Sequence, residues 1–247
     1  MLLVRTTAPV LDAHCYVIAA GEGGDALVVD PGAGAAEGVA ELLERYRLRV
    51  GAVVLTHAHA DHVWDAAAVA GGAPVYVAAP DQYRLEDPAG ALGEPLGATF
   101  TQLAGTPWRR PEVVVPLPYA TLSGGGGKLV PGVVVRALPA PGHTEGSTVL
   151  IVRGQLETPG GLPEGPDVVA DDDGTHLLAL CGDVVFARSV GRTDLPGGDE
   201  REMSSTLRTL VRALPPTTVL LPGHGGATVL SRERATNPYL RGVLGRR

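Results

Sequence analysis

Cysteine is scarce in this sequence, which holds only Cys15 and Cys181 among its 247 residues. The two lie far apart and outside any CxxC pattern, which excludes a cysteine-based zinc site and makes a disulfide framework implausible. Both lie in apolar, strand-like segments, where packing is the ordinary role of a small thiol side chain. This cysteine usage predicts a cytoplasmic protein.

Basic and aromatic residues are also few. Lys128 is the only lysine, aromatic residues make up 4% of the chain, and the formal net charge is -7. An acidic chain has no broad attraction for a phosphate backbone, so we expect no nucleic-acid partner. Residues 1–20 are interrupted by Arg5, Asp12 and His14, which argues against a signal peptide or a membrane span there. We therefore expect no membrane partner either.

Apolar runs separated by amphipathic stretches dominate the first part of the chain. Residues 26–30, 50–56 and 74–79 predict buried strands, and residues 37–49 and 63–70 predict helices between them. This alternation is typical of a layered α/β fold. The length suits one large domain with a full core, so we predict a single α/β domain over residues 1–247.

Two segments depart from this alternation. Residues 80–120 are rich in proline and glycine and contain Tyr83, Phe100, Trp108 and Tyr119. We interpret them as an insertion that covers the pocket, the alternative being a surface excursion without a functional role. Residues 153–178 contain an acidic triplet without the ligand spacing of an EF-hand, and predict a flexible hairpin.

Histidines cluster where predicted strands end. The segment His57-Ala58-His59-Ala60-Asp61-His62 lies between a predicted strand and a predicted helix. A lone histidine is usually a surface or core residue, but four ligand-type residues within this segment are hard to explain by packing. Imidazoles and carboxylates without cysteine suit zinc, iron or manganese. In such a loop, His57 and His59 can turn to one ion while Asp61 and His62 turn to a second.

Three further candidates follow strand-like segments later in the chain: His143 after Pro141-Gly142, Asp183 after Gly182, and His224 after Pro222-Gly223. Each is weak evidence alone, because such turns are common in loops. Loops at strand ends assemble sites from distant parts of a chain, so together they supply the ligands that a two-metal site needs.

These segments, in this order, resemble the motifs of the metallo-β-lactamase superfamily, and residues 186–199 and 236–240 are similar to its short glyoxalase II-like branch. The resemblance implies a four-layer αββα sandwich. It also implies that His57, His59 and His143 hold one metal ion, that Asp61, His62 and His224 hold a second, and that Asp183 bridges them. Two divalent ions are expected, zinc first, with iron or manganese as alternatives.

The same resemblance implies a metal-dependent hydrolase that cleaves small S-acyl thiols of the S-lactoylglutathione type. Two close cations lower the pKa of a shared water from about 15.7 toward 7, which would provide hydroxide to attack the thioester carbonyl. Asp61 would be the catalytic residue, both a ligand and the group that orients the nucleophile.

Several alternatives stay open. An iron-dependent persulfide dioxygenase would use His57, His143 and Asp183 around one iron, although residues 195–198 look more like the hydrolase branch. A non-catalytic metal-binding scaffold is the alternative from another class, and the fold also hosts β-lactamases and ribonucleases. Little of the usual glutathione-binding region follows His224, which leaves Arg232, Arg234 and Asn237 as candidates for a carboxylated thiol. The carrier thiol and the oligomeric state stay open.

Overall fold

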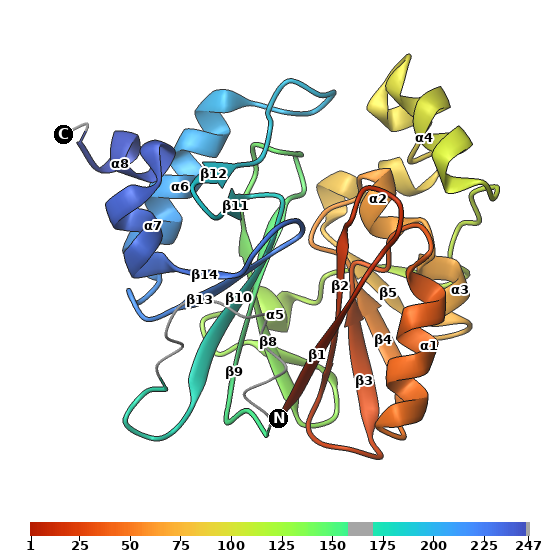
Figure 1. Ribbon diagram of the computed structural model, residues 1–247, viewed down its shortest axis with the longest axis horizontal. Coiled ribbons are helices and arrows are strands. Elements are labelled where there is room, and N and C mark those ends of the chain that lie inside the picture. The colour runs from red at the N-terminus through yellow and green to blue at the C-terminus, as the bar shows by residue number, and fades with distance from the viewer. Residues whose placement is uncertain (158–169, 246–247) are drawn as a thin grey trace.

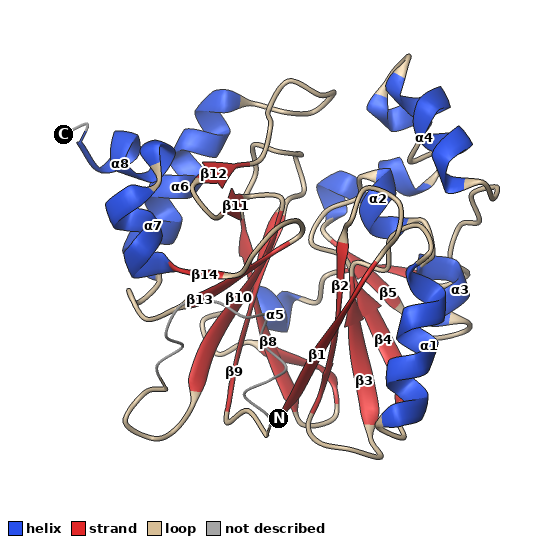
Figure 2. Cartoon of the chain, viewed as in Figure 1, coloured by secondary structure: helices blue, strands red, loops and turns tan. Residues whose placement is uncertain are grey.

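Two β-sheets face one another in the computed structural model, which describes residues 1–157 and 170–245. Helices cover the outer face of each sheet, so the layers run helix, sheet, sheet, helix (Figures 1 and 2). This confirms the predicted four-layer α/β sandwich.

The first sheet contains six strands in the order β1-β2-β3-β4-β5-β6. The strands β1 to β3 pair antiparallel, and the pairs from β3 to β6 are parallel. The strands are β1 (Leu2–Thr7), β2 (His14–Ala19), β3 (Asp25–Val29), β4 (Arg49–Val54), β5 (Val75–Val77) and β6 (Val114–Pro116). The α-helices of this half are α1 (Ala35–Arg45), α2 (Ala60–Val63), α3 (Ala66–Ala70) and α4 (Leu96–Ala104). Because parallel strands end at one edge, the loops after β3, β4 and β5 meet there.

The second sheet has the order β14-β13-β10-β9-β8-β7, beside a small β11-β12 hairpin. Its strands are β7 (Gly127–Val130), β8 (Val133–Pro139), β9 (Thr148–Gly154), β10 (His176–Gly182), β13 (Val219–Pro222) and β14 (Thr228–Val229), and the hairpin is β11 (Val185–Phe186) and β12 (Ser189–Val190). The helices of this half are α5 (Tyr119–Leu122), α6 (Glu200–Ala213), α7 (Leu230–Thr236) and α8 (Pro238–Gly245).

Alternating side chains of the strands fill separate apolar layers. In β3, Leu27 packs between the sheets, whereas Val28 packs against α1 on the outside. A third layer lies between the second sheet and α6, where Leu207 and Leu210 are buried. Strands buried on both faces read as continuous apolar runs, which is why β3 and β4 are visible in the sequence.

The structure describes all of residues 80–120 and part of residues 153–178. Residues 80–120 include the 3-10 helices η1 (Ala79–Leu85) and η2 (Gly90–Leu92), then α4 and the edge strand β6. The strands β9 and β10 pair antiparallel, with His176 opposite Gly154. Residues 158–169 of the predicted hairpin lie outside the described residues. Within the described part of the chain, no helix is both long and apolar enough to cross a membrane.

Candidate metal centre

The segment after β4, a loop that runs into α2, carries four of the predicted ligands, and Asp30 at the end of β3 holds it in place. The Asp30 carboxylate accepts hydrogen bonds from Thr56 N at 2.7 Å and Thr56 Oγ1 at 2.6 Å. It also accepts one from His62 Nδ1 at 3.1 Å. Asp30 is buried and has a φ of 51°, a conformation that non-glycine residues rarely adopt. From the sequence, Asp30 is predicted only as the last residue of the buried strand at 26–30.

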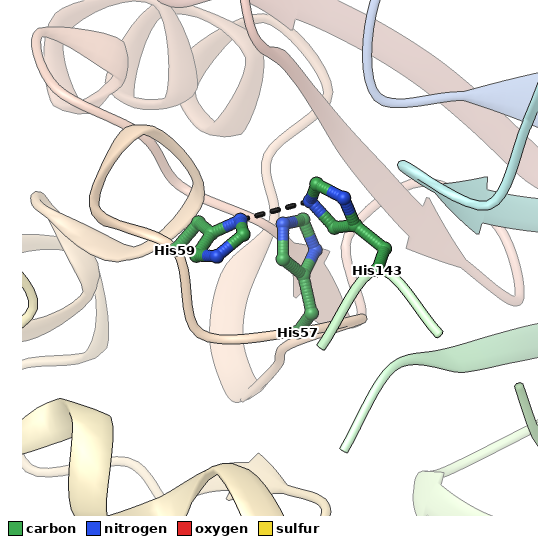
Figure 3. A group of neighbouring side chains, drawn as sticks. All are labelled: His57, His59 and His143. Carbon is green, nitrogen blue, oxygen red and sulfur yellow. Dashed lines mark hydrogen bonds between the residues drawn. The ribbon is translucent and has the colours of Figure 1, made fainter. Parts of the chain in front are cut away.

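Three buried imidazoles form a first cluster. The ligand nitrogens of His57, His59 and His143 lie within 4.8 Å of one another. His59 Nδ1 and His143 Nε2 are 2.8 Å apart, and the three side chains converge from two loops (Figure 3). The residues come from the loop after β4 and the loop between β8 and β9, so each sheet contributes to the cluster.

A second cluster combines Asp61, His62 and His224, whose ligand atoms also lie within 4.8 Å of one another. His224 Nε2 is 3.3 Å from His62 Nε2 and 3.2 Å from Asp61 Oδ2. This cluster again draws on both halves of the molecule, because His224 follows β13.

Asp183 lies between the two clusters. Its carboxylate is 3.3 Å from His62 Nε2, 3.6 Å from His224 Nε2 and 3.7 Å from His143 Nε2. The structure therefore brings all seven predicted site residues to one place. A third triplet, of Asp30, His57 and His62, is also compact, but both Asp30 oxygens are already occupied by hydrogen bonds from the loop.

The ring orientations of three histidines suit metal binding. In each, Nδ1 donates a hydrogen bond away from the centre, which leaves the lone pair of Nε2 facing inward. The pairs are His57 with Thr56 Oγ1 at 3.1 Å, His62 with Asp30 Oδ2 at 3.1 Å and His143 with Arg192 O at 2.8 Å. Converging lone pairs repel one another unless a cation lies between them.

Burial is a second reason to expect a cation among these histidines. His57 Nε2 is buried and has no hydrogen-bond partner among the described residues, an arrangement that costs about 1–3 kcal/mol when nothing compensates it. Burial also lowers the pKa of His59 to about 3, so this ring is in the neutral form that binds metals. The donor set of imidazoles and carboxylates, without thiolate, fits zinc, iron or manganese.

Charge is balanced within the second cluster. Although burial opposes it, the carboxylates of Asp183 and Asp61 raise the pKa of His62. In turn, and again against the effect of burial, the His62 ring lowers the pKa of Asp61. The same ring, also against the effect of burial, lowers the pKa of Asp183, so both acids are ionised near neutral pH. A cation bound here would take the place of the proton on His62 Nε2.

Residues 80–120 contribute two buried residues that the sequence did not single out. Asp81 accepts hydrogen bonds from Ala58 N at 2.9 Å, Thr144 Oγ1 at 2.8 Å and Gly146 N at 2.7 Å. It therefore ties the loop of His57 to the loop of His143. The fully buried Arg84 donates to Glu145 Oε2 at 2.5 Å and to Pro196 O at 2.8 Å, which joins two loops of the second half.

Glycines lie beside the candidate ligands because the backbone at these positions passes very close to atoms of the ligand residues. A Cβ at Gly223 would lie 2.4 Å from Asp183 Oδ1 and 2.5 Å from His62 Cε1. A Cβ at Gly191 would lie 1.8 Å from Asp183 O. Only glycine fits at these two positions.

The expected role of Asn237 in holding substrate is wrong. This side chain is buried, and its Nδ2 donates to Ser189 O at 2.9 Å and to Glu233 Oε2 at 3.1 Å. It anchors the start of α8 to the β11-β12 hairpin. Arg232 is exposed, and Arg234 borders a different surface pocket beside Pro215 and Pro216.

Comparison with known proteins adds the family. The family model described as "Metallo-beta-lactamase superfamily" matches residues 8–224. The chain belongs to the metallo-β-lactamase superfamily. An uncharacterized protein of Mycobacterium tuberculosis is 37% identical over 246 residues, which cover 98% of this chain and 99% of that protein. The hydroxyacylglutathione hydrolase GloC of Haemophilus influenzae is 27% identical over 217 residues, 87% of each chain.

Solved structures share the fold of this chain. The BLEG-1 B3 metallo-β-lactamase has a TM-score of 0.71 and 26% identity, covering 97% of this chain and 99% of its own. TTHA1623, solved in a di-iron-bound form, has a TM-score of 0.68 and 28% identity, covering 95% and 98%. ETHE1 from Myxococcus xanthus has a TM-score of 0.66 and covers 98% and 85%, and at 20% identity it shows the fold alone.

Proposed function

We propose that this member of the superfamily is a metal-dependent hydrolase of the glyoxalase II-like kind, a thioesterase that acts on small S-acyl thiols. The observation that carries the proposal is the pair of three-residue clusters on either side of Asp183. Two complete clusters suit two cations, as expected for hydrolysis, whereas a one-iron oxygenase needs only three ligands.

The chemistry that two divalent cations would supply is a lowered pKa for a bound water and a polarised substrate carbonyl. His57, His59 and His143 would hold one cation, Asp61, His62 and His224 the other, and Asp183 would contact both. Asp61 has 15% of its side chain exposed, so its carboxylate can accept a hydrogen bond from an attacking water and orient it. Asp30 and Arg192 O keep the rings of His62 and His143 fixed through their Nδ1 hydrogen bonds.

The thioester part of the proposal is supported by sequence similarity. Residues 186–199 resemble the glyoxalase II-like branch, and one relative, from Haemophilus influenzae, carries the name hydroxyacylglutathione hydrolase. Persulfide dioxygenation is the competing reaction, with His57, His143 and Asp183 around a single iron. The identity of the metal alone does not separate the two reactions, because the imidazole and carboxylate ligands of this centre suit iron as well as zinc.

One experiment separates these reactions. Purified protein with its metals quantified is assayed on S-lactoylglutathione and on glutathione persulfide, with an oxygen electrode in both assays. We expect hydrolysis of the thioester without oxygen uptake. Oxygen consumption with persulfide, together with one bound iron per chain, would overturn the proposal. A folded protein that binds no metal would instead support the non-catalytic scaffold.

A further inference from the structure

A groove of about 520 Å³ lies between α6 and α8, which run beside each other next to β12 (Figure 1). Helix α6 lines it with Met203, Leu207 and Arg208, and α8 lines it with Tyr239. Residues 190–193 close one side. This volume is typical of small-molecule sites, and none of the seven candidate metal ligands lines the groove.

The groove and the metal centre share a wall. Arg192 O accepts the hydrogen bond from His143 Nδ1, and Gly191 lies against the backbone of Asp183. Both residues also line the groove. The N-terminal end of α6 is also near the metal centre, because Asp199 N donates a hydrogen bond to Gly142 O at 2.9 Å. A molecule bound in the groove would therefore lie one backbone segment, residues 190–193, away from the metal centre.

Charged side chains are ordered along α6. Glu200, Ser204 and Arg208 are spaced four residues apart, which places them on one face of the helix, and all three line the groove. Glu200 stands at the end near the metal centre, and Arg208 lies about 12 Å farther along, at 1.5 Å per residue. The groove thus has a carboxylate near the centre and a guanidinium at its far end.

Arg208 is available for a ligand. It is partly buried, and it makes no ion pair or side-chain hydrogen bond with the described residues. The other arginine of the groove, Arg192, is held by Asp194 through two hydrogen bonds of 2.7 and 2.8 Å. The charged residues that line the groove are two arginines, Arg192 and Arg208, and one carboxylate, Glu200.

We propose that this groove binds the carrier part of the thioester substrate, and that Arg208 binds an anionic end group of that carrier, a carboxylate or a phosphate. The inference rests on the proposed thioesterase function. A distance of about 12 Å matches three to four extended peptide units, and arginine pairs with carboxylates and phosphates through two parallel hydrogen bonds. Substrate selection would then depend on the length and charge of the thiol carrier.

Steady-state kinetics test the proposal on two thioesters, S-lactoylglutathione and the neutral S-lactoyl-N-acetylcysteamine. Arg208→Ala should raise KM for S-lactoylglutathione about tenfold or more, the usual scale for losing a charged hydrogen bond. The preference for the anionic substrate should fall by the same factor, and Arg208→Lys should restore part of it. Arg212→Ala is the matched control, because Arg212 is exposed on the same helix outside the groove. An unchanged preference in Arg208→Ala would overturn the proposal.

Binding of free thiols separates a failed groove from a failed function. Calorimetry with glutathione, with coenzyme A and with N-acetylcysteamine needs no turnover. Wild type should bind at least one of the two anionic thiols more tightly than the neutral one, and Arg208→Ala should lose that difference. Glutathione binding would indicate carboxylate recognition, and coenzyme A binding would indicate phosphate recognition. If no thioester is hydrolysed but this pattern of thiol binding is observed, the proposed reaction is wrong and the proposed role of the groove is supported. If thioesters are hydrolysed and the thiols bind alike, the groove assignment is wrong.

Discussion

The two sheets supply the metal centre in different ways. The first half gives His57, His59, Asp61 and His62 from one short segment, the loop after β4 and the helix α2 that follows it. The second half gives His143, Asp183 and His224 from three separate loops. A strand-to-helix loop can turn several neighbouring side chains into one site. In the second half, each of the three ligands follows a different strand. Bringing them together therefore depends on the order of those strands in the sheet.

The second half supplies fewer ligands, but we expect its Asp183 to have the largest effect on activity and metal content, because Asp183 faces both clusters. Asp183→Ala should lower turnover on the order of a thousandfold, the scale of losing a group that stabilises the transition state, and should reduce bound metal. Circular dichroism should show an unchanged fold. The exposed Asp172→Ala serves as the control. A fully active, fully metallated Asp183→Ala would show that the clusters do not depend on this residue.

In the first half, the buried carboxylate of Asp30 should control metal affinity without touching a metal. Asp30→Asn keeps the shape of the side chain but weakens the hydrogen bond to His62 Nδ1 and the support of Thr56. Loss of such a partner typically costs ten- to a hundredfold in metal affinity, measurable by chelator competition. Asp65→Asn is a matched control, since Asp65 accepts from Gly34 N and Ala36 N in the same half. Equal affinities in the two variants would contradict this role.

Sequence reasoning worked where the pattern is local. The apolar runs at 26–30, 50–56 and 74–79 correspond to β3, β4 and β5, and the predicted helix 37–49 corresponds to α1. The predicted helix 63–70 is instead two short helices, α2 and α3. There, Asp65 turns back to accept hydrogen bonds from the backbone at the start of α1. Each of the seven site residues could be named because it lies in the segment that follows a predicted strand.

The supporting residues could not be named in the same way. Asp81 and Arg84 lie in a segment without regular periodicity, and their importance comes from contacts with residues about 60 or more positions away. A charged residue in a proline-rich stretch has no sequence feature that separates a buried role from an exposed one. Asn237 shows the opposite error, because a polar residue near a helix start looked available and is buried.

Arg84 should contribute more to stability than an ordinary surface arginine. Arg84→Met leaves Glu145 and Pro196 O without their donor, so we expect the free energy of unfolding to fall by about 2 kcal/mol. Urea denaturation measures this change. Arg110→Met removes an exposed pair with Glu86 and should cost under about 1 kcal/mol. A smaller effect at Arg84 than at Arg110 would mean that the loops of the second half hold their positions unaided.

The smallest expected effect concerns His14 of β2, whose Nδ1 donates to Pro222 O in β13, where the two halves meet. Burial, with Arg5 nearby, lowers the pKa of His14 to about 4. The neutral ring is therefore favoured in the folded state, so its contribution to stability is complete above about pH 6.5 and is lost as the pH falls toward 4. Between pH 7.5 and 5.5 this amounts to about 1 kcal/mol. Denaturation of wild type and His14→Gln at both values should show that difference, and identical pH dependence would contradict it.

Metal stoichiometry tests the central claim most directly. Elemental analysis of wild type, His59→Ala and His224→Ala, each with circular dichroism as a check of folding, measures whether the two clusters act as separate sites. We predict two divalent ions per chain in the wild type, about one in each variant, and thioester hydrolysis by the wild type only. One ion per chain in a fully active wild type, with hydrolysis retained after His224→Ala, would contradict the two-cluster centre.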